Sequence, residues 1–102
     1  MTFIVAYITY KSMEEAEKVS SSLLADKIVG CVNYFPIKST FWWQGDITNE
    51  DEIVALVKTR QENWEKLKNE VLRIHPYDVP CIMKFEVEAN QEYEDWINSA
   101  TK

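Results

Sequence analysis

The sequence is poor in residues that break or cross-link a chain. Its 102 residues include two glycines, three prolines and two cysteines. With so few breakers there is no linker, repeat or low-complexity tract, so we predict a single domain over residues 1–102. The cysteines, Cys31 and Cys81, lie far apart and without CxxC spacing, which argues against a zinc knuckle, a redox dithiol and a disulfide framework.

Basic residues and long apolar runs are also scarce. Acidic residues outnumber Lys and Arg by 17 to 11, and the net charge of −6 disfavours nucleic acid and anionic membranes as partners. No run approaches the roughly 20 apolar residues of a membrane span. The short apolar run Phe3–Ile8 has no basic segment before it, so it does not read as a signal peptide. We therefore expect a cytoplasmic protein with reduced thiols, without a nucleic-acid or membrane partner.

The single histidine, His75, limits the chemistry that the chain can perform. Nucleophilic catalysis needs a nucleophile, a base and an orienting group. Cys31 and Cys81 lie in apolar strand contexts, where free cysteine is usually an inert core residue. His75 ends a predicted helix, where its charged form is favourable to the helix dipole. These observations predict a protein that is not an enzyme.

Apolar residues are abundant, at 46% of the chain with 13% aromatic, and their runs predict strands. Such runs occupy residues 3–10, 29–34, 40–43, 53–57 and 82–87. Pro36 interrupts the extended segment after the second run and predicts a bulge, a bend or a sheet edge. Gly45 marks a tight turn. Residues 29–57 are therefore expected to form one long antiparallel hairpin.

Apolar residues at steps of three and four predict three helices. A capping box, in which Ser or Thr precedes Glu by three residues, marks the first two starts at Ser12–Glu15 and Thr59–Glu62. The first helix should end near Asp26, Pro76 should stop the second, and Asn90 should cap the third. The stripes are Met13, Ala16, Val19 and Leu23, then Trp64, Leu67, Val71 and Ile74, then Tyr93, Trp96, Ile97 and Ala100.

This order of elements predicts an α+β fold, a ferredoxin-like split βαβ sandwich with a long hairpin between its second and third strands and a C-terminal helix. Two helices would cover one face of the sheet. The strands at 3–10 and 53–57 do not alternate apolar and polar residues, as strands with a wet face should. An apolar surface must therefore cover the second face. Another copy of the chain is the simplest candidate, and the alternative is the final helix, which is long enough to cover only part of the sheet.

Spacing alone leaves the candidate sites open. Cys31, Cys81 and His75 carry the soft ligands that Cu(I) prefers, but they form a site only if the fold or an oligomer axis brings them together. The tandem Trp42–Trp43 is expected at an interface rather than in a ligand pocket. The carboxylates of residues 50–52 are expected in a solvated turn. No glycine-rich nucleotide-binding motif is present.

Five stretches along the whole chain resemble the divalent-cation-tolerance (CutA) family. They are 29–33, 39–45, 52–59, 74–80 and 93–96. The resemblance implies a single CutA-like domain over residues 1–102, with a ferredoxin-like fold that assembles as a homotrimer around a three-fold axis. It implies no established enzymatic activity and a link to tolerance of copper and other divalent metals. The architecture is also similar to that of nitrogen-regulatory signalling proteins, which are trimers that bind small effectors between subunits.

The resemblance further implies site residues. Cys31 and His75 match positions expected to bind copper or another divalent cation. The residues expected to line an intersubunit cleft are Trp43, Glu52, Lys58, Tyr77 and Asp78. The chain departs from the family at Gln44 and Asp46, where family hairpins carry Glu and Lys, and Cys81 matches no family motif.

Three functions are compatible with these features. The first is a homotrimer that binds copper or another divalent ion through Cys31 and His75. The second is an effector-binding signalling module in which Lys58, Trp43 and Tyr77 contact a small anion. The third is a non-catalytic trimeric scaffold that presents a surface to a protein partner. The family resemblance places metal binding first.

Overall fold

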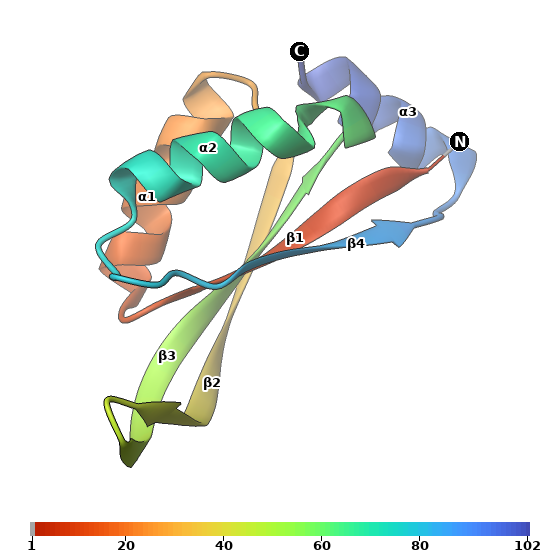
Figure 1. The fold of residues 1–102 in the computed structure, drawn as a ribbon. Coiled ribbons are helices and arrows are strands. Elements are labelled where there is room, and N and C mark those ends of the chain that lie inside the picture. The colour runs from red at the N-terminus through yellow and green to blue at the C-terminus, as the bar shows by residue number, and fades with distance from the viewer. Residues whose placement is uncertain (1) are drawn as a thin grey trace.

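Strands and helices follow one another in the order that the apolar spacing predicts (Figure 1). The structure is a computed structural model that describes residues 2–102. Its elements are β1 (Phe3–Tyr10), α1 (Met13–Ala25), β2 (Cys31–Trp43), β3 (Asp46–Thr59), a short 3₁₀ helix (Gln61–Asn63), α2 (Trp64–Ile74), β4 (Ile82–Val87) and α3 (Gln91–Ala100).

The four strands form one sheet in the order β2-β3-β1-β4, with every neighbouring pair antiparallel. Helices α1 and α2 lie on the same face of this sheet (Figure 1). Their apolar stripes meet the strand residues that point toward them, among them Ala6, Ile8 and Val57, and these side chains are fully buried. The predicted ferredoxin-like fold is therefore confirmed.

The hairpin β2–β3 is longer than the rest of the sheet. It pairs without a bulge from Cys31 with Lys58 to Trp43 with Asp46, whereas β1 follows β3 only as far as Ile53. Residues 37–52 therefore form a two-stranded arm, which extends beyond the other strands (Figure 1). We call it the hairpin arm.

Two local features explain how this hairpin is built. Pro36 lies within β2, which is an edge strand of the sheet, and pairs with Ile53 without a bulge. Of the predicted alternatives, the sheet edge is therefore confirmed. An edge strand tolerates proline because the missing N–H leaves no strand pairing unsatisfied. At the tip, Gln44 and Gly45 have φ of 51° and 84°. Positive φ at both positions is what a two-residue type I′ hairpin turn requires.

The first of the two predicted capping boxes has its N-cap bond, and the second is wrong. Ser12 Oγ accepts a hydrogen bond from the backbone N of Glu15 at 3.2 Å, as predicted. Thr59 instead ends β3, fully buried, and its hydroxyl donates to the carbonyl of Ile28 at 2.6 Å. Its oxygen accepts from Asn63 Nδ2 at 3.1 Å rather than from a backbone N–H, and α2 begins at Trp64 without a side-chain cap.

Helix α3 begins after Asn90, as predicted, but the Asn90 side chain does not cap it and donates to Glu92 instead. Ile97 is fully buried, whereas Trp96 is about half exposed although it belongs to the same predicted stripe. The helix packs closely against the chain before β2: a Cβ at Gly30 would lie 3.3 Å from Ala100 Cβ. That close approach explains the glycine.

The sheet face that α1 and α2 do not cover is largely apolar. Strand register places its residues in rows: Phe85–Val5–Lys58–Cys31, Met83–Tyr7–Leu56–Asn33 and Thr9–Val54–Phe35. We call this surface the open face. Met83 and Phe85 are 46% and 52% exposed on it. Helix α3 covers the corner near Phe3, where Tyr93 packs, and Thr9 and Val54 are buried, but the part of the face around Met83 and Phe85 remains uncovered in one chain.

No helix within residues 2–102 is long and apolar enough to cross a membrane.

Candidate metal-ligating residues and the groove beside the hairpin arm

Cys31 and His75, the predicted metal ligands, lie at opposite ends of the sheet. Cys31 pairs with Lys58 at the start of β2. His75 follows α2 and contacts the carbonyl of Thr9, whose register partner on β3 is Val54. Four residues of strand separate Val54 from Lys58, which is about 14 Å at ~3.4 Å per residue. The fold therefore does not bring the two ligands together within one chain.

The imidazole of His75 is also fully engaged. It is buried, and its Nε2 lies 2.8 Å from the Thr9 carbonyl, while its Nδ1 accepts the backbone N–H of Tyr77 at 3.1 Å. This pattern defines the neutral tautomer with the proton on Nε2. Burial lowers the pKa of His75, which also favours the neutral form. No lone pair is left on this ring for a metal ion.

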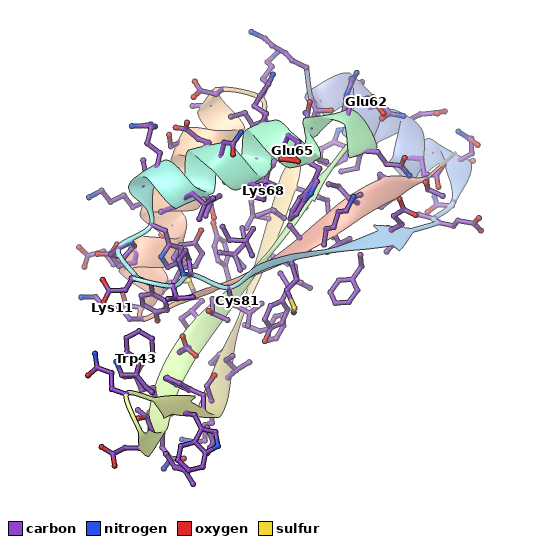
Figure 2. The ribbon with its side chains drawn as sticks, viewed as in Figure 1. Lys11, Trp43, Glu62, Glu65, Lys68 and Cys81 are labelled. Carbon is purple, nitrogen blue, oxygen red and sulfur yellow. The ribbon has the colours of Figure 1, made fainter. Side chains whose placement is uncertain are left out.

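Four of the five predicted cleft residues do come together. Trp43, Glu52, Tyr77 and Asp78 line a groove of about 780 Å³ between the hairpin arm and the loop at 76–81. Figure 2 shows Trp43 on the arm and Cys81 at the end of the loop that enters β4. The lining is completed by Tyr7, Thr9, Ser39, Thr40, Phe41, Trp42, Thr48, Glu50, Pro76, Val79 and Cys81. We call this hollow the arm groove.

The arm groove is acidic. Its described lining contains three carboxylates, Glu50, Glu52 and Asp78, and one thiol, Cys81, but no Lys or Arg. Glu52 is only 8% exposed and accepts a hydrogen bond from Tyr77 Oη at 2.8 Å. Burial and this carboxylate raise the pKa of Tyr77, so its hydroxyl stays protonated and donates. Burial first, and Glu52 second, also raise the pKa of the Cys81 thiol.

One prediction about this region is corrected. The carboxylates of residues 50–52 do not form a solvated turn but belong to β3. Because side chains alternate along a strand, Glu50 and Glu52 line the groove while Asp51 points away and pairs with Lys38 at 2.9 Å. Lys58, the fifth residue expected at an intersubunit cleft, does not line the groove of its own chain. It lies at the far end of the sheet and donates to Tyr93 Oη, so its place in a cleft between subunits stays a prediction.

Cys81 is the groove residue that no family motif assigns. The sequence left it either as an inert core thiol or as a soft ligand for a metal ion. The signal was present in the alternation of β4. Cys81 precedes Met83 and Phe85 at steps of two, the spacing that puts residues on one face of a strand. Within residues 2–102, however, no group of three or more His, Cys, Asp or Glu side chains is placed to hold a metal ion.

Comparison with known proteins gives a consistent result. Residues 4–100 match the family model described as CutA1 divalent ion tolerance protein. The chain is 38% identical over 100 residues to the divalent-cation tolerance protein CutA of Pyrococcus horikoshii, covering 97% of this chain and 98% of that protein. It is 43% identical over 97 residues to the protein of the same name from Archaeoglobus fulgidus, covering 94% and 95%. These names describe tolerance proteins rather than enzymes.

Solved structures share the fold over their full length. The Archaeoglobus fulgidus protein, described as a periplasmic divalent cation tolerance protein CutA, superimposes with a TM-score of 0.93 at 42% identity and covers 100% of both chains. A structure described as PII-like protein CutA from Nostoc sp. PCC 7120 in apo form gives a TM-score of 0.90 at 28% identity, covering 97% of each chain. Because one relative is described as periplasmic, the cytoplasmic location of this chain stays a prediction.

Proposed function

The chain belongs to the family of CutA1 divalent ion tolerance proteins, and from this premise we propose that it acts in metal tolerance as a homotrimer that binds a divalent cation in the arm groove. Copper is the first candidate ion, and no catalytic step is involved. The observation that carries the proposal is Glu52, a buried carboxylate in a groove whose described lining has no basic residue. Such a groove attracts cations.

The donor set of the groove suits a soft or borderline ion. A thiolate from Cys81 is a ligand that Cu(I) prefers, and carboxylate oxygens of Glu52 and Asp78 suit a divalent cation. One chain does not supply a closed site. The proposal therefore places the ion where another subunit adds ligands. It does not use His75, whose two ring nitrogens are already bonded.

The open face and the hairpin arm support self-association. Phe35, Met83 and Phe85 expose between 37% and 52% of their surface on the open face, and Trp42 and Ile47 expose 71% and 61% on the arm. A soluble monomer rarely presents so many large apolar groups close together. Packing three open faces around an axis would bury the apolar residues of the open face. A hairpin arm that reaches across a neighbouring chain would bury Trp42 and Ile47.

A titration of reduced protein with Cu(I) and Cu(II) tests the metal site. We expect Cys81→Ser and Glu52→Gln each to weaken the binding of at least one ion tenfold or more. Cys31→Ser is the matched control, because it removes the other thiol, which lies at the far end of the sheet. Loss of binding in Cys31→Ser with full binding in Cys81→Ser would overturn the assignment to the groove.

A second candidate function is the binding of a small effector. The arm groove, at about 780 Å³, is much larger than a metal ion needs and falls in the range of small-molecule pockets, roughly 300–1,000 Å³. A thermal-shift screen with metabolites tests this alternative. A ligand at 100 times its dissociation constant stabilises the folded state by about 2.7 kcal/mol, so a true effector should give a clear shift.

A further inference from the structure

Glu52 has one carboxylate oxygen that no other residue around the arm groove uses. Its Oε2 accepts a hydrogen bond from Tyr77 Oη at 2.8 Å, whereas Oε1 has no hydrogen-bond or ion-pair partner within residues 2–102. The side chain is only 8% exposed, but Oε1 is not among the fully enclosed polar atoms that lack a partner in the described chain. It therefore remains accessible to a ligand. A charged oxygen that has lost most of its water is stabilised when a cationic donor reaches it.

A second carboxylate, that of Glu50, lies on the same side of the hairpin arm. Glu50 and Glu52 are two residues apart in β3, so their side chains point the same way and their Cα atoms are about 7 Å apart at ~3.4 Å per residue. Burial, then Glu52 and then Glu50 raise the pKa of Tyr77, so both carboxylates act on the same hydroxyl. Neither forms an ion pair within residues 2–102, and the described lining of the groove has no Lys or Arg. Two uncompensated negative charges suit a ligand with two positive charges.

Aromatic rings line the same side of the arm. Phe41 and Trp43 are two residues apart in β2 and therefore share a face. That face also carries Glu50, because Glu50 pairs directly with Ser39, which precedes Phe41 by two residues. The two rings are 36% and 40% exposed and line the groove, and Tyr77 adds a third ring from the loop that forms the other wall. Aromatic faces attract organic cations and pack against methylene groups.

The charges and the rings together select among positively charged ligands. A metal ion binds carboxylate oxygens but makes no use of the ring surfaces. A quaternary ammonium ion uses the rings but has no N–H to donate to Glu52 Oε1. A protonated amine uses both, because its N–H groups donate to carboxylates while its methylene groups pack on the rings. A groove of about 780 Å³ is also large enough for an extended chain with more than one ammonium group.

We propose that the arm groove binds an aliphatic diamine or polyamine. One ammonium group donates to Glu52 Oε1, a second meets Glu50, and the methylene chain between them packs on Phe41 and Trp43. The inference rests on the second candidate function, because it gives the effector of the arm groove a chemical class, and on the groove remaining open between subunits, as the binding of a metal ion there also requires. It needs no metal ion, since Cys81 has no part in it.

Calorimetric titrations of the reduced, metal-free protein test the proposal, at one ionic strength because salt screens exposed charges. The probes are 1,4-diaminobutane, then 1-aminobutane, which has a single ammonium group, and 1,4-butanediol, which has a similar length and no charge. We expect saturable binding of the diamine, roughly tenfold weaker binding of the monoamine because one charge-assisted hydrogen bond is lost, and no binding of the diol. Equal affinity for the diamine and the monoamine, or no saturable binding of the diamine, would overturn the proposal.

A matched pair of variants makes the test specific. Glu50→Gln removes one negative charge from the groove and should weaken diamine binding roughly tenfold. Asp51→Asn should bind the diamine as the wild type does, because Asp51 is the next carboxylate on β3 but points away from the groove and pairs with Lys38. This pair decides the question, since neither substitution changes the size of a side chain and light scattering can verify that both variants keep the wild-type mass. Equal binding by Glu50→Gln and the wild type would contradict the placement of the ligand.

The aromatic contribution has its own variant. Trp43→Leu keeps the charges of the groove, removes a ring and should weaken diamine binding several-fold while the binding of copper is unchanged. Unchanged diamine binding in a Trp43→Leu protein of wild-type mass would show that the rings do not contact the ligand.

Failure of this proposal and failure of the metal site give different results. Cys81→Ser should lose copper and still bind the diamine, whereas Glu50→Gln should bind the diamine weakly and keep copper. If the wild type bound copper but no diamine, the metal site would stand and the diamine would be the wrong ligand. If another class of metabolite stabilised the protein and the diamine did not, the effector function would stand and the chemical class proposed for it would be wrong.

Discussion

The imidazole ring of His75 lies almost parallel to the phenol ring of Tyr10, with an interplanar angle of 14° and ring centroids 4.7 Å apart. Tyr10 is fully buried in the core between the sheet and the helices. The next residues after His75 turn away to line the arm groove, where Tyr77 meets Glu52. The contacts of His75 with the core thus hold the start of the loop at 76–81 in place, which is a structural role rather than a ligand role.

Stability should depend on pH through His75. Burial lowers its pKa in the folded state below the ordinary value of 6.5. As the pH falls below 6.5, the unfolded chain takes up a proton that the folded chain resists, so the free energy of unfolding decreases until the folded pKa is reached. Above pH 6.5 this contribution is constant.

Urea unfolding at pH 7.5 and 5.5, at one protein concentration, measures the effect. The wild type should lose more stability between these values than His75→Gln, which has no group that titrates there. An equal loss in both proteins would show that the pH dependence arises elsewhere, for example from carboxylates.

Much of the fold was predictable because local signals agreed with the global arrangement. The Ser12–Glu15 box, the stop at Pro76 and the alternation of Met83 and Phe85 each require only neighbouring residues to be read correctly. Thr59 does not cap a helix because it stays in β3, paired with Ile4, which is distant in sequence, and its hydroxyl oxygen accepts from Asn63 Nδ2 instead of a backbone N–H. A capping motif predicts a local bond and carries no information about such a competitor.

The reactivity of Cys81 should depend on Glu52. Burial and the nearby carboxylate raise the pKa of the thiol, so little thiolate is present near neutral pH. Glu52→Gln removes the charge and should increase the rate of alkylation of Cys81 by iodoacetamide several-fold at pH 7.5. Cys31, in the same protein, is the internal control and should react at an unchanged rate; peptide mass mapping separates the two. If Cys81 were alkylated at the same rate in Glu52→Gln and in the wild type, the electrostatic description of the groove would be contradicted.

The open face should be required for assembly. Phe85→Asp places a charge among the exposed apolar residues of that face and should reduce the mass measured by light scattering from about three times the 12.0 kDa of one chain to that of a single chain. Leu72→Asp is the matched control, because Leu72 is 51% exposed but lies on α2. If both variants kept the wild-type mass, the open face would not be the interface.

The turn of the hairpin arm offers a test of local strain. Gln44 has a φ of 51°, a region that costs most L residues about 1–2 kcal/mol and that Asn adopts more readily. Gln44→Asn should therefore raise the free energy of unfolding by roughly 0.5–1 kcal/mol. Gly45→Ala, at a φ of 84°, should lower it by about 1 kcal/mol. Chemical denaturation of both variants at equal concentration checks the signs, and a loss for Gln44→Asn would show that the turn is held by other contacts.

The candidate site was less predictable than the fold, because it depends on where strands end in space. Motif matching placed Lys58 with Trp43 and Tyr77 in a cleft between subunits. Within one chain strand register separates them by the length of the sheet, so that cleft stays a prediction. Motif matching also proposed His75 as a ligand, since a sequence shows the residue type and not the partners of its two nitrogens. Cys81 matched no motif, yet it precedes β4 and lines the arm groove together with Glu52.

Native mass spectrometry of the reduced protein with added copper tests the central proposal most directly, because one spectrum reports both assembly and bound metal. We expect a species of about 36 kDa, three times the mass of one chain, that retains copper in the wild type and in Cys31→Ser but loses it in Cys81→Ser and Glu52→Gln. A 12.0 kDa monomer, or a trimer that retains the same copper in all four proteins, would contradict a trimer that binds a divalent cation in the arm groove.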